Sequence, residues 1–444
     1  MNQTELQRAE QLVASKDYAQ ALTVLREHWL ENPRDRKAIH LFSRLMKSLG
    51  KTELSGSLYK LSESDDALDH DVQNLFEAGF KLIDEHELQL AVMLLERCAE
   101  KLPQESVINY ELGFALMSLH RFGAAVPYLE RSITGEPDFD TKLNLCVCHT
   151  MQRDAQKASA LIAELEKLAS TDEEKEEIAH RKMVLRRLEF FASKAKLSPR
   201  DWLFVLYGSV ILHDPAMEDL RKAIKTGVFT GIAFDTDEPS GSTVAGALTF
   251  KDIAWTLLVL EKLLANLGYE FDVIEFYSPL SRPLAEAMSH LMDLPVRSFG
   301  GEDSTDRALM IMAWGPNIIG PHKSFMANSK KRVLFAYGLS TLQPLPLTPD
   351  VVGELGPNVA MPWAETLDED TQFLRSDVFD MPDDPQVKAI DRILQEISEL
   401  ESRPEIIQQV EEIAHYYKPK RDMIVMGNPH TFPQRPEYSA EIMI

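Results

Sequence analysis

Cysteine, long apolar runs and positive charge are all scarce in this sequence. The 444 residues include three cysteines, Cys98, Cys146 and Cys148, and this small odd number argues against a disulfide framework and fits a reducing compartment. No apolar run reaches the roughly 18 residues that a membrane-spanning helix needs, so we expect no membrane insertion. Acidic residues outnumber basic ones by 70 to 47. The resulting net charge of −23 argues against nucleic acid as a partner, because phosphate binding needs a positive surface.

The beginning of the chain also lacks a targeting pattern. The segment MNQTELQRAEQLVASKDYAQ has no basic stretch followed by an apolar one, so it does not resemble a secretory signal. We therefore expect a cytoplasmic protein. The composition, 44% hydrophobic and 26% charged, is that of an ordinary globular protein, and the length predicts two or three domains.

A repeat of fixed period occupies the first half of the sequence. Residues 74–103 and 108–137 align without gaps, and four pairs of equivalent residues lie 34 positions apart: Gly79 and Gly113, Ala91 and Ala125, Leu95 and Leu129, and Pro103 and Pro137. A fixed period of this length indicates a helical solenoid. The glycine and the alanine permit close crossing of two antiparallel helices, and the proline ends the second helix.

This pattern resembles the tetratricopeptide repeat, a helix-turn-helix unit of 34 residues, over about residues 2–172. Three weaker units span about residues 17–33, 39–61 and 143–168. The unit at 39–61 has Ser55 where alanine is expected, and the unit at 143–168 lacks the proline. We count five units. Residues 171–197 read as a helix with an acidic first turn and a basic last turn, which we expect to cap the stack. The predicted first domain, an N-terminal helical solenoid, is residues 1–195.

The resemblance implies that the second, fifth, ninth and twelfth positions of each first helix face a concave groove. These positions hold Lys37, His40, Arg44 and Lys47 in the second unit, Phe76, Phe80 and Ile83 in the third, Tyr110, Phe114 and Met117 in the fourth, and Asn144, Cys148 and Met151 in the fifth. A groove that is cationic at one end and aromatic in the middle predicts a protein partner, a peptide or helix with acidic and apolar residues. Tetratricopeptide repeats that bind chaperones hold a C-terminal carboxylate with a clamp of asparagine and lysine side chains. These positions do not reproduce that clamp, so that function is not expected here.

A plainer interpretation of the same residues stays open. Phe80 and Phe114 can pack against neighbouring helices, because an aromatic stripe at helical spacing is often core. Cys146 and Cys148 form a Cys-x-Cys pair, and no second cysteine pair completes a zinc site. We therefore predict no metal and no cofactor.

The second half of the sequence has a different period. Short apolar runs begin near residues 202, 226, 271, 307 and 331, and helical stretches lie between several of them. This alternation predicts an α/β domain with a mostly parallel sheet over residues 196–418, although the first run reads equally well as a buried helix. Two C-terminal helices divided by Pro404 end this domain, and residues 419–444 are expected to form a flexible or docking tail.

Two loops of this second domain are candidate sites. Gly241, Ser242 and Thr243 precede a helix whose free amides can hold an anion, but no nucleotide-binding glycine pattern is present. Asp235-Thr-Asp237 resembles the first motif of haloacid-dehalogenase-like phosphatases, with a solvated acidic loop as the alternative. A basic loop at residues 315–332 can bind an anionic ligand, or it can match the charge of this chain's own acidic strip at 368–384.

No Ser-His-Asp or Cys-His arrangement is visible from local spacing, so the sequence names no catalytic residue. We expect a non-catalytic scaffold or adaptor whose solenoid groove binds a partner segment. The alternative is an enzyme or sensor that acts on a small anionic, phosphorylated ligand through the α/β domain, with the repeats as a targeting arm. A third possibility is a structural subunit of a larger complex.

Overall fold

The computed structural model describes residues 2–63, 71–133, 138–213, 248–300, 307–315, 332–340, 348–356, 361–364 and 385–424. The chain divides into two compact units, Met1–Ile178 and Ala179–Ile444. We call the first the helical-repeat unit and the second the sheet unit.

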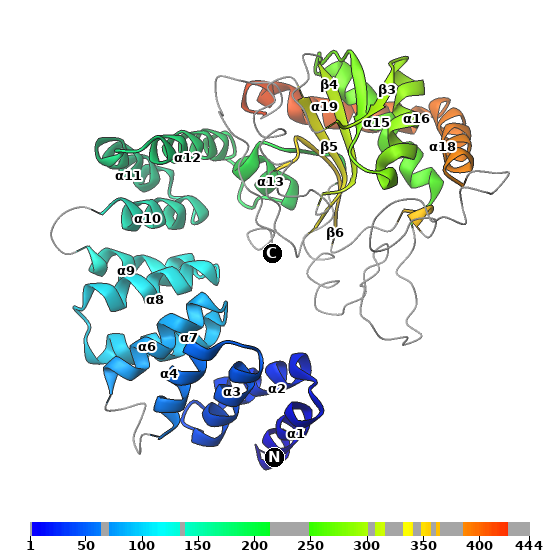
Figure 1. Ribbon diagram of the computed structural model, residues 1–444. Helices are drawn as coiled ribbons and strands as arrows, with labels where there is room; N and C mark the ends of the chain where they lie inside the picture. The colour runs from blue at the N-terminus through cyan, green and yellow to red at the C-terminus, as the bar shows by residue number, and fades with distance from the viewer. Residues whose placement is uncertain are drawn as a thin grey trace. The chain divides into compact units, whose positions relative to one another are not determined.

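The described residues of the helical-repeat unit form a stack of five antiparallel helix pairs followed by the start of α12 (Figure 1). The pairs are α1 (Asn2–Ser15) with α2 (Tyr18–Glu31), α3 (Arg36–Ser48) with α4 (Thr52–Glu63), α6 (Val72–Asp84) with α7 (Leu88–Lys101), α8 (Ser106–Ser118) with α9 (Phe122–Ser132), and α10 (Phe139–Met151) with α11 (Ala155–Leu168). The predicted fold of five helical repeats is confirmed.

The repeated glycines lie where the two helices of a pair touch. A Cβ atom placed on Gly79 would come within 2.9 Å of Leu95 Cγ, and one on Gly113 within 2.7 Å of Leu129 Cγ. Ala91 is fully buried at the same crossing. The small side chains therefore set the distance between the helices, as the period predicted.

Each pair also makes its turn with one residue in the left-handed region. The five residues are Lys16, Gly50, His86, His120 and Arg153, with φ between +57° and +80°. In the fourth pair the His120 amide donates to Met117 O (2.9 Å) and the Arg121 amide to Leu116 O (2.9 Å). Equivalent bonds close the other four turns. This is a Schellman motif, which usually has glycine at the left-handed position. The sequence did not predict it, because only one of the five residues is glycine.

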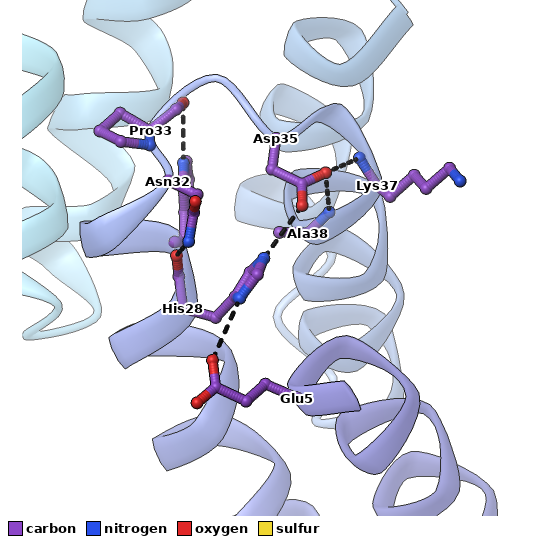
Figure 2. A network of polar contacts seen from close by, with 8 residues as sticks. Glu5, His28, Asn32, Pro33, Asp35, Lys37 and Ala38 are labelled. Carbon is purple, nitrogen blue, oxygen red and sulfur yellow. Dashed lines mark hydrogen bonds and ion pairs between the residues drawn. The ribbon is translucent and has the colours of Figure 1, made fainter. Parts of the chain in front are cut away.

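The start of α3 is fixed by a polar network that joins three helices (Figure 2). Asp35 caps α3 by accepting hydrogen bonds from the amides of Lys37 (2.9 Å) and Ala38 (3.3 Å). The same carboxylate lies 2.9 Å from Nε2 of His28 in α2, whose Nδ1 lies 3.6 Å from Glu5 in α1. The Lys37 side chain points away from this network (Figure 2). The network therefore positions the first turn of α3, and with it the basic face of that helix.

Within its described residues, the sheet unit contains six parallel strands in the order β1-β6-β5-β4-β2-β3. The strands are β1 (Val210–Ile211), β2 (Val273–Phe276), β3 (Val296–Ser298), β4 (Ala308–Trp314), β5 (Arg332–Ser340) and β6 (Val351–Gly356). The central strand β4 is buried along its whole length, as expected for a parallel strand with both faces covered. The predicted mostly parallel α/β arrangement is confirmed, and every pairing among the described strands is parallel.

The described helices of the sheet unit are α13 (Pro199–Tyr207), α15 (Phe250–Asn266), α16 (Arg282–Met292), α18 (Pro385–Glu401) and α19 (Pro404–Tyr417), with short 3₁₀ turns η1 (Pro279–Ser281) and η4 (Lys418–Met423). Helices α18 and α19 pack on α15 (Figure 1). The Thr256 side chain of α15 lies within hydrogen-bond distance of Tyr337 in β5. The division at Pro404 is confirmed, because this proline occupies the first turn of α19.

Some strands differ from the sequence-based expectation. The run at 202–212 forms most of α13 and then the two-residue strand β1, because Gly208 ends the helix with φ +71°. Strands β3 and β6 were not predicted, since three and six residues of mixed character give a weak pattern. The expected strand near residue 226 lies outside the described residues.

Helix α12 (Asp172–Phe190) crosses the division between the units. Its second half packs in the sheet unit, where fully buried Arg187 donates hydrogen bonds to Met423 O (2.9 Å) and Val205 O (3.3 Å). The start of the expected tail is also part of this unit, since Met423 and Ile424 are buried. Residues 425–444 lie outside the described part of the chain.

Candidate functional site

The helical-repeat unit contains a pocket of about 450 Å³ along the α3–α4 hairpin, which we call the α3–α4 pocket. Its lining consists of His40, Ser43, Arg44 and Lys47 from α3, and Thr52, Ser55, Gly56 and Tyr59 from α4. Three of the four basic residues expected in the groove therefore line one cavity. Lys37, the fourth, is exposed and does not line it.

Helical spacing explains why the basic residues converge. His40, Arg44 and Lys47 follow each other at intervals of four and three residues, so they share one face of α3. The two helices are joined beside this face, where the Ser43 hydroxyl donates to Ser55 O (2.8 Å) and lies 3.2 Å from the Ser55 hydroxyl. The Tyr59 ring of α4 lies 5.6 Å from the His40 ring and is 49% exposed.

The charge of the α3–α4 pocket is not compensated. No carboxylate lines it, and within the described ranges Arg44 and Lys47 have no acidic partner. Neighbouring lysines of the same unit are paired, with Lys51 2.5 Å from Glu85 and Lys81 2.7 Å from Glu53. Unpaired cations around a cavity, in a chain with a net charge of −23, give this surface a positive charge that attracts anions.

The expected aromatic positions lie outside this pocket, on α6 and α8. The Phe76 and Phe80 rings stack with centroids 6.3 Å apart, and Phe80 is 36% exposed. Phe76 packs in part against the core, as do Tyr110 and Met117, and Phe114 is half-buried. The plainer interpretation as core therefore describes part of this surface, while Phe80 keeps an exposed ring.

Acidic groups surround the aromatic position on α8. Burial, followed by the charges of Asp140 and Glu111, raises the pKa of Tyr110, whose hydroxyl also hydrogen-bonds with Asn144 of α10. Burial and the charge of Asp84 likewise raise the pKa of Glu111. Sequence positions alone did not reveal the approach of Asp140 and Asp84, because these acids belong to the neighbouring helices α10 and α6.

The remaining positions in the fifth pair are less accessible. Asn144 and Met151 are half-buried, and Cys148 is buried, which raises the pKa of its thiol to about 12. Cys146 is also buried, and its thiol points at Ala158 O (3.8 Å).

Sequence reasoning missed the α4 side of the pocket. Thr52, Ser55, Gly56 and Tyr59 belong to the second helix of their unit, whereas the resemblance drew attention to the first helix alone. The available signal was the hydroxyl-rich stretch TELSGSLY, which departs from the repeat pattern at Ser55 and Gly56.

The sheet unit has a second polar cluster at the carboxyl ends of its strands, where parallel sheets commonly bind ligands. His213 follows β1, and its Nε2 lies 3.0 Å from Thr256 Oγ1 of α15. The Thr256 hydroxyl donates to Asp252 O (2.9 Å), so it accepts from His213 Nε2–H and leaves Nδ1 as an acceptor. Burial lowers the pKa of His213 to about 4, and the Trp255 ring lies 4.3 Å away.

Glu354 of β6 adds a carboxyl group to this edge. The His213 amide donates to O of the neighbouring Gly353 (3.1 Å). Burial, and then the charge of Asp252, raise the pKa of Glu354. In the described part of the chain its carboxyl group has no hydrogen-bond or ion-pair partner. The expected anion loop, Gly241, Ser242 and Thr243, lies outside the described residues, as do Asp235, Asp237 and nearly all of the basic loop and the acidic strip.

The residues that the structure describes contain no group of three or more histidine, cysteine or acidic side chains placed to hold a metal. Among the helices within the described ranges, none combines the length and hydrophobicity needed to cross a membrane.

Neither a family model nor a curated protein matches the chain. Solved structures similar to it include the pilF protein of Pseudomonas aeruginosa, which covers 44% of this chain and 86% of its own at 14% identity and a TM-score of 0.27. A thermophilic TPR protein of Thermus thermophilus covers 41% of this chain and 100% of its own at 19% identity and a TM-score of 0.25.

MamA from Desulfovibrio magneticus RS-1 covers 38% of this chain and 97% of its own at 14% identity and a TM-score of 0.24. At these identities and TM-scores the similarity carries no conclusion about function or partners. The helical-repeat unit is tetratricopeptide-like by its own helix pairs, crossings and turns.

Proposed function

We propose that the helical-repeat unit is a protein-interaction module that captures an extended or helical partner segment, with the α3–α4 pocket as the anchor for an anionic group. The charges of Arg44 and Lys47, which have no acidic partner among the described residues and line the pocket together with His40, are the observation that carries this proposal. Residues that only maintain the fold do not need unpaired cations around a cavity, whereas recognition of an anion does.

The exposed aromatic surface supports a polypeptide as the partner. Phe80 keeps 36% of its surface exposed on the next helix pair, and Tyr59 keeps 49% at the pocket. Aromatic residues and arginine are enriched at protein interfaces, and tyrosine and arginine are among the residue types that dominate binding energy there. The acids around Tyr110 repel an anion, and the exposed Phe80 ring offers an apolar contact. We therefore expect the partner to be anionic at the pocket and apolar further along the stack.

Capture of the partner from native lysate tests this role. Full-length protein with Arg44→Gln and Lys47→Gln is compared with unaltered protein by cross-linking and pull-down, since glutamine keeps polarity and removes charge. We expect capture to fall about tenfold or more, as for loss of two charge-assisted contacts. The matched control is Arg97→Gln with Lys101→Gln on α7, which removes the same charge away from the pocket. Equal capture by both double variants would reject the pocket as the anchor.

A second candidate function belongs to the sheet unit. We propose a small-molecule site at the carboxyl ends of β1 and β6, favoured by the unpartnered Glu354 carboxyl and the acceptor Nδ1 of His213. The described groups there accept hydrogen bonds and carry negative or no charge. They favour a ligand that donates hydrogen bonds over the anionic ligand suggested by the sequence.

A thermal-shift screen of the full chain against amines, sugars and nucleosides tests the second candidate. A stabilising compound is then repeated with Glu354→Gln, which is nearly equal in shape and cannot ionise. We expect the shift to shrink in the variant. Stabilisation that is identical with and without Glu354 would place the ligand elsewhere.

A further inference from the structure

We propose that the α3–α4 pocket recognises a phosphate monoester, carried by a phosphorylated side chain of the partner segment. The choice of a protein as the source of the phosphate rests on the proposed interaction role. The preference for phosphate over carboxylate rests on the pocket's own donors.

The donors of the pocket exceed what a carboxylate can use. The Ser43 hydroxyl donates its hydrogen bond to Ser55 O, and the Ser55 hydroxyl is positioned to donate to Ser43 Oγ. The Arg44 guanidinium, the Lys47 ammonium and the hydroxyls of Thr52 and Tyr59 line the cavity without any such bond to another described residue. These groups offer two permanent positive charges and several N–H and O–H donors.

A phosphate monoester matches this set in charge and in geometry. It carries close to two negative charges near neutral pH and three acceptor oxygens, against one charge and two oxygens for a carboxylate. Arginine forms bidentate bonds to phosphate, and lysine adds a point charge. Because no acid among the described residues lines the pocket, a dianion meets no repulsion there from these lining side chains.

The size of the pocket indicates that the phosphate arrives on a larger group. A volume of about 450 Å³ leaves room beyond the anion for the carrier. Gly56 contributes to this space, since a Cβ atom added there meets nothing within 4 Å. Two exposed rings, Tyr59 at the pocket and Phe80 of the next helix pair, can contact the residues on either side of a phosphorylated side chain. A free phosphate compound has no such flanking residues.

Calorimetric titration of the full chain with small probes tests the preference. The probes are phosphoserine and aspartate, each with its backbone blocked by acetyl and amide groups, and glucose 6-phosphate. We expect the blocked phosphoserine to bind about tenfold more tightly than the blocked aspartate, with the difference shrinking as salt rises. Equal affinity for the two, or no saturable binding of phosphoserine, overturns the proposal. Tighter binding of glucose 6-phosphate overturns the protein source and leaves the phosphate preference standing.

Two variants locate the binding. Gly56→Leu fills the pocket without changing charge, and Arg44→Gln removes the bidentate donor; each is expected to weaken phosphoserine binding about tenfold. Gly123→Leu on α9, where an added Cβ meets only Gln152 Oε1 at 3.7 Å, is the control for a leucine in a helix. If circular dichroism shows that Gly56→Leu does not fold, Gly56→Ala replaces it as the pocket-filling variant. Unchanged binding in Arg44→Gln overturns the assignment.

Phosphatase treatment of a captured partner separates this inference from the proposed function. Capture that depends on Arg44 and disappears after treatment supports both. Capture that depends on Arg44 and survives treatment supports the interaction role and overturns the phosphate.

Discussion

Asp35 connects three helices of the helical-repeat unit through one carboxylate. It caps α3, contacts His28 of α2, and through His28 reaches Glu5 of α1 (Figure 2). We expect Asp35→Ala to lower the free energy of unfolding by about 1 to 2 kcal/mol, because the cap and the histidine lose their acceptor. Urea unfolding measures this loss. Asp35→Asn, which keeps an acceptor oxygen, is expected to lose less.

The contribution of Asp35 depends on pH with a definite sign. Burial opposes ionisation, but hydrogen bonds from His28 and from the amides of Ala38 and Lys37 outweigh it and lower the pKa of this carboxyl. Its stabilisation is therefore complete above about pH 4 and is lost as the pH falls through the lowered value. The difference in stability between unaltered protein and Asp35→Asn should shrink below pH 4. A difference that stays constant down to pH 2 would contradict this account.

Lys420 of the sheet unit is a charged residue that lowers stability, whereas Asp35 raises it. It is 4% exposed, its Nζ lies 3.5 Å from the centroid of the Tyr416 ring, and burial lowers its pKa to about 8. The unfolded chain holds this proton to higher pH, so the lysine costs stability at pH 7 and the cost disappears as the pH rises above 8.

We therefore expect the stability of unaltered protein, relative to Lys420→Met, to rise between pH 7 and pH 10 by up to about 3 kcal/mol. Chemical unfolding of both proteins at several pH values makes the measurement, and the ionisation of tyrosines at about pH 10 cancels in the difference between them. A flat difference across this range would show that Lys420 titrates as an exposed lysine.

At the scale of elements, each of the five turns of the stack has one residue in the left-handed region, although the turns differ in sequence. His86 is an exposed residue at φ +59°, and Gly50 occupies the equivalent place at φ +80°. A side chain in this region costs about 1 kcal/mol more than glycine. We expect His86→Gly to raise stability by about 0.5 to 1 kcal/mol and Gly50→Ala to lower it by a similar amount. Changes of the same sign in both variants would contradict the shared turn.

The helical glycines predict a second contrast between elements. Alanine at Gly113 places its Cβ 2.7 Å from Leu129 Cγ and 3.2 Å from a backbone nitrogen. We expect Gly113→Ala to cost about 1 to 3 kcal/mol through overpacking. Gly56→Ala meets open space and should gain about 0.5 to 1 kcal/mol of helix propensity. Thermal unfolding of the two variants compares the same chemical change in two environments, and equal effects would exclude close helix crossing as the reason for the glycine.

At the scale of the whole molecule, the division between the units falls inside α12. Arg187 is fully buried and hydrogen-bonds with Met423 O and Val205 O, and Leu188 and Phe191 are buried in the same unit. We expect a fragment of residues 172–444 to exceed a fragment of residues 196–444 in unfolding free energy by about 3 kcal/mol or more, because the shorter one loses these buried groups. Arg187→Ala in the full chain is the companion variant. Equal stability of the two fragments would move the division to residue 195.

The candidate site was partly predictable from the sequence. The spacing of His40, Arg44 and Lys47 placed them on one helix face, which is a local property of a helix. Their enclosure by Thr52, Ser55 and Tyr59 depends on how α4 crosses α3, and no pattern within either helix reports that crossing. The acids near Tyr110 were missed for the same reason.

The sequence by itself determined the two kinds of architecture. A period of 34 residues required stacked helix pairs, and buried apolar runs separated by helices required a parallel sheet, because both follow from the geometry of successive residues along one element. Tertiary structure alone decided which charges stay unpaired, which hydroxyls enclose the α3–α4 pocket, and to which unit the end of α12 belongs. Those outcomes depend on contacts between residues far apart in the chain, and such contacts leave no periodic trace in either partner.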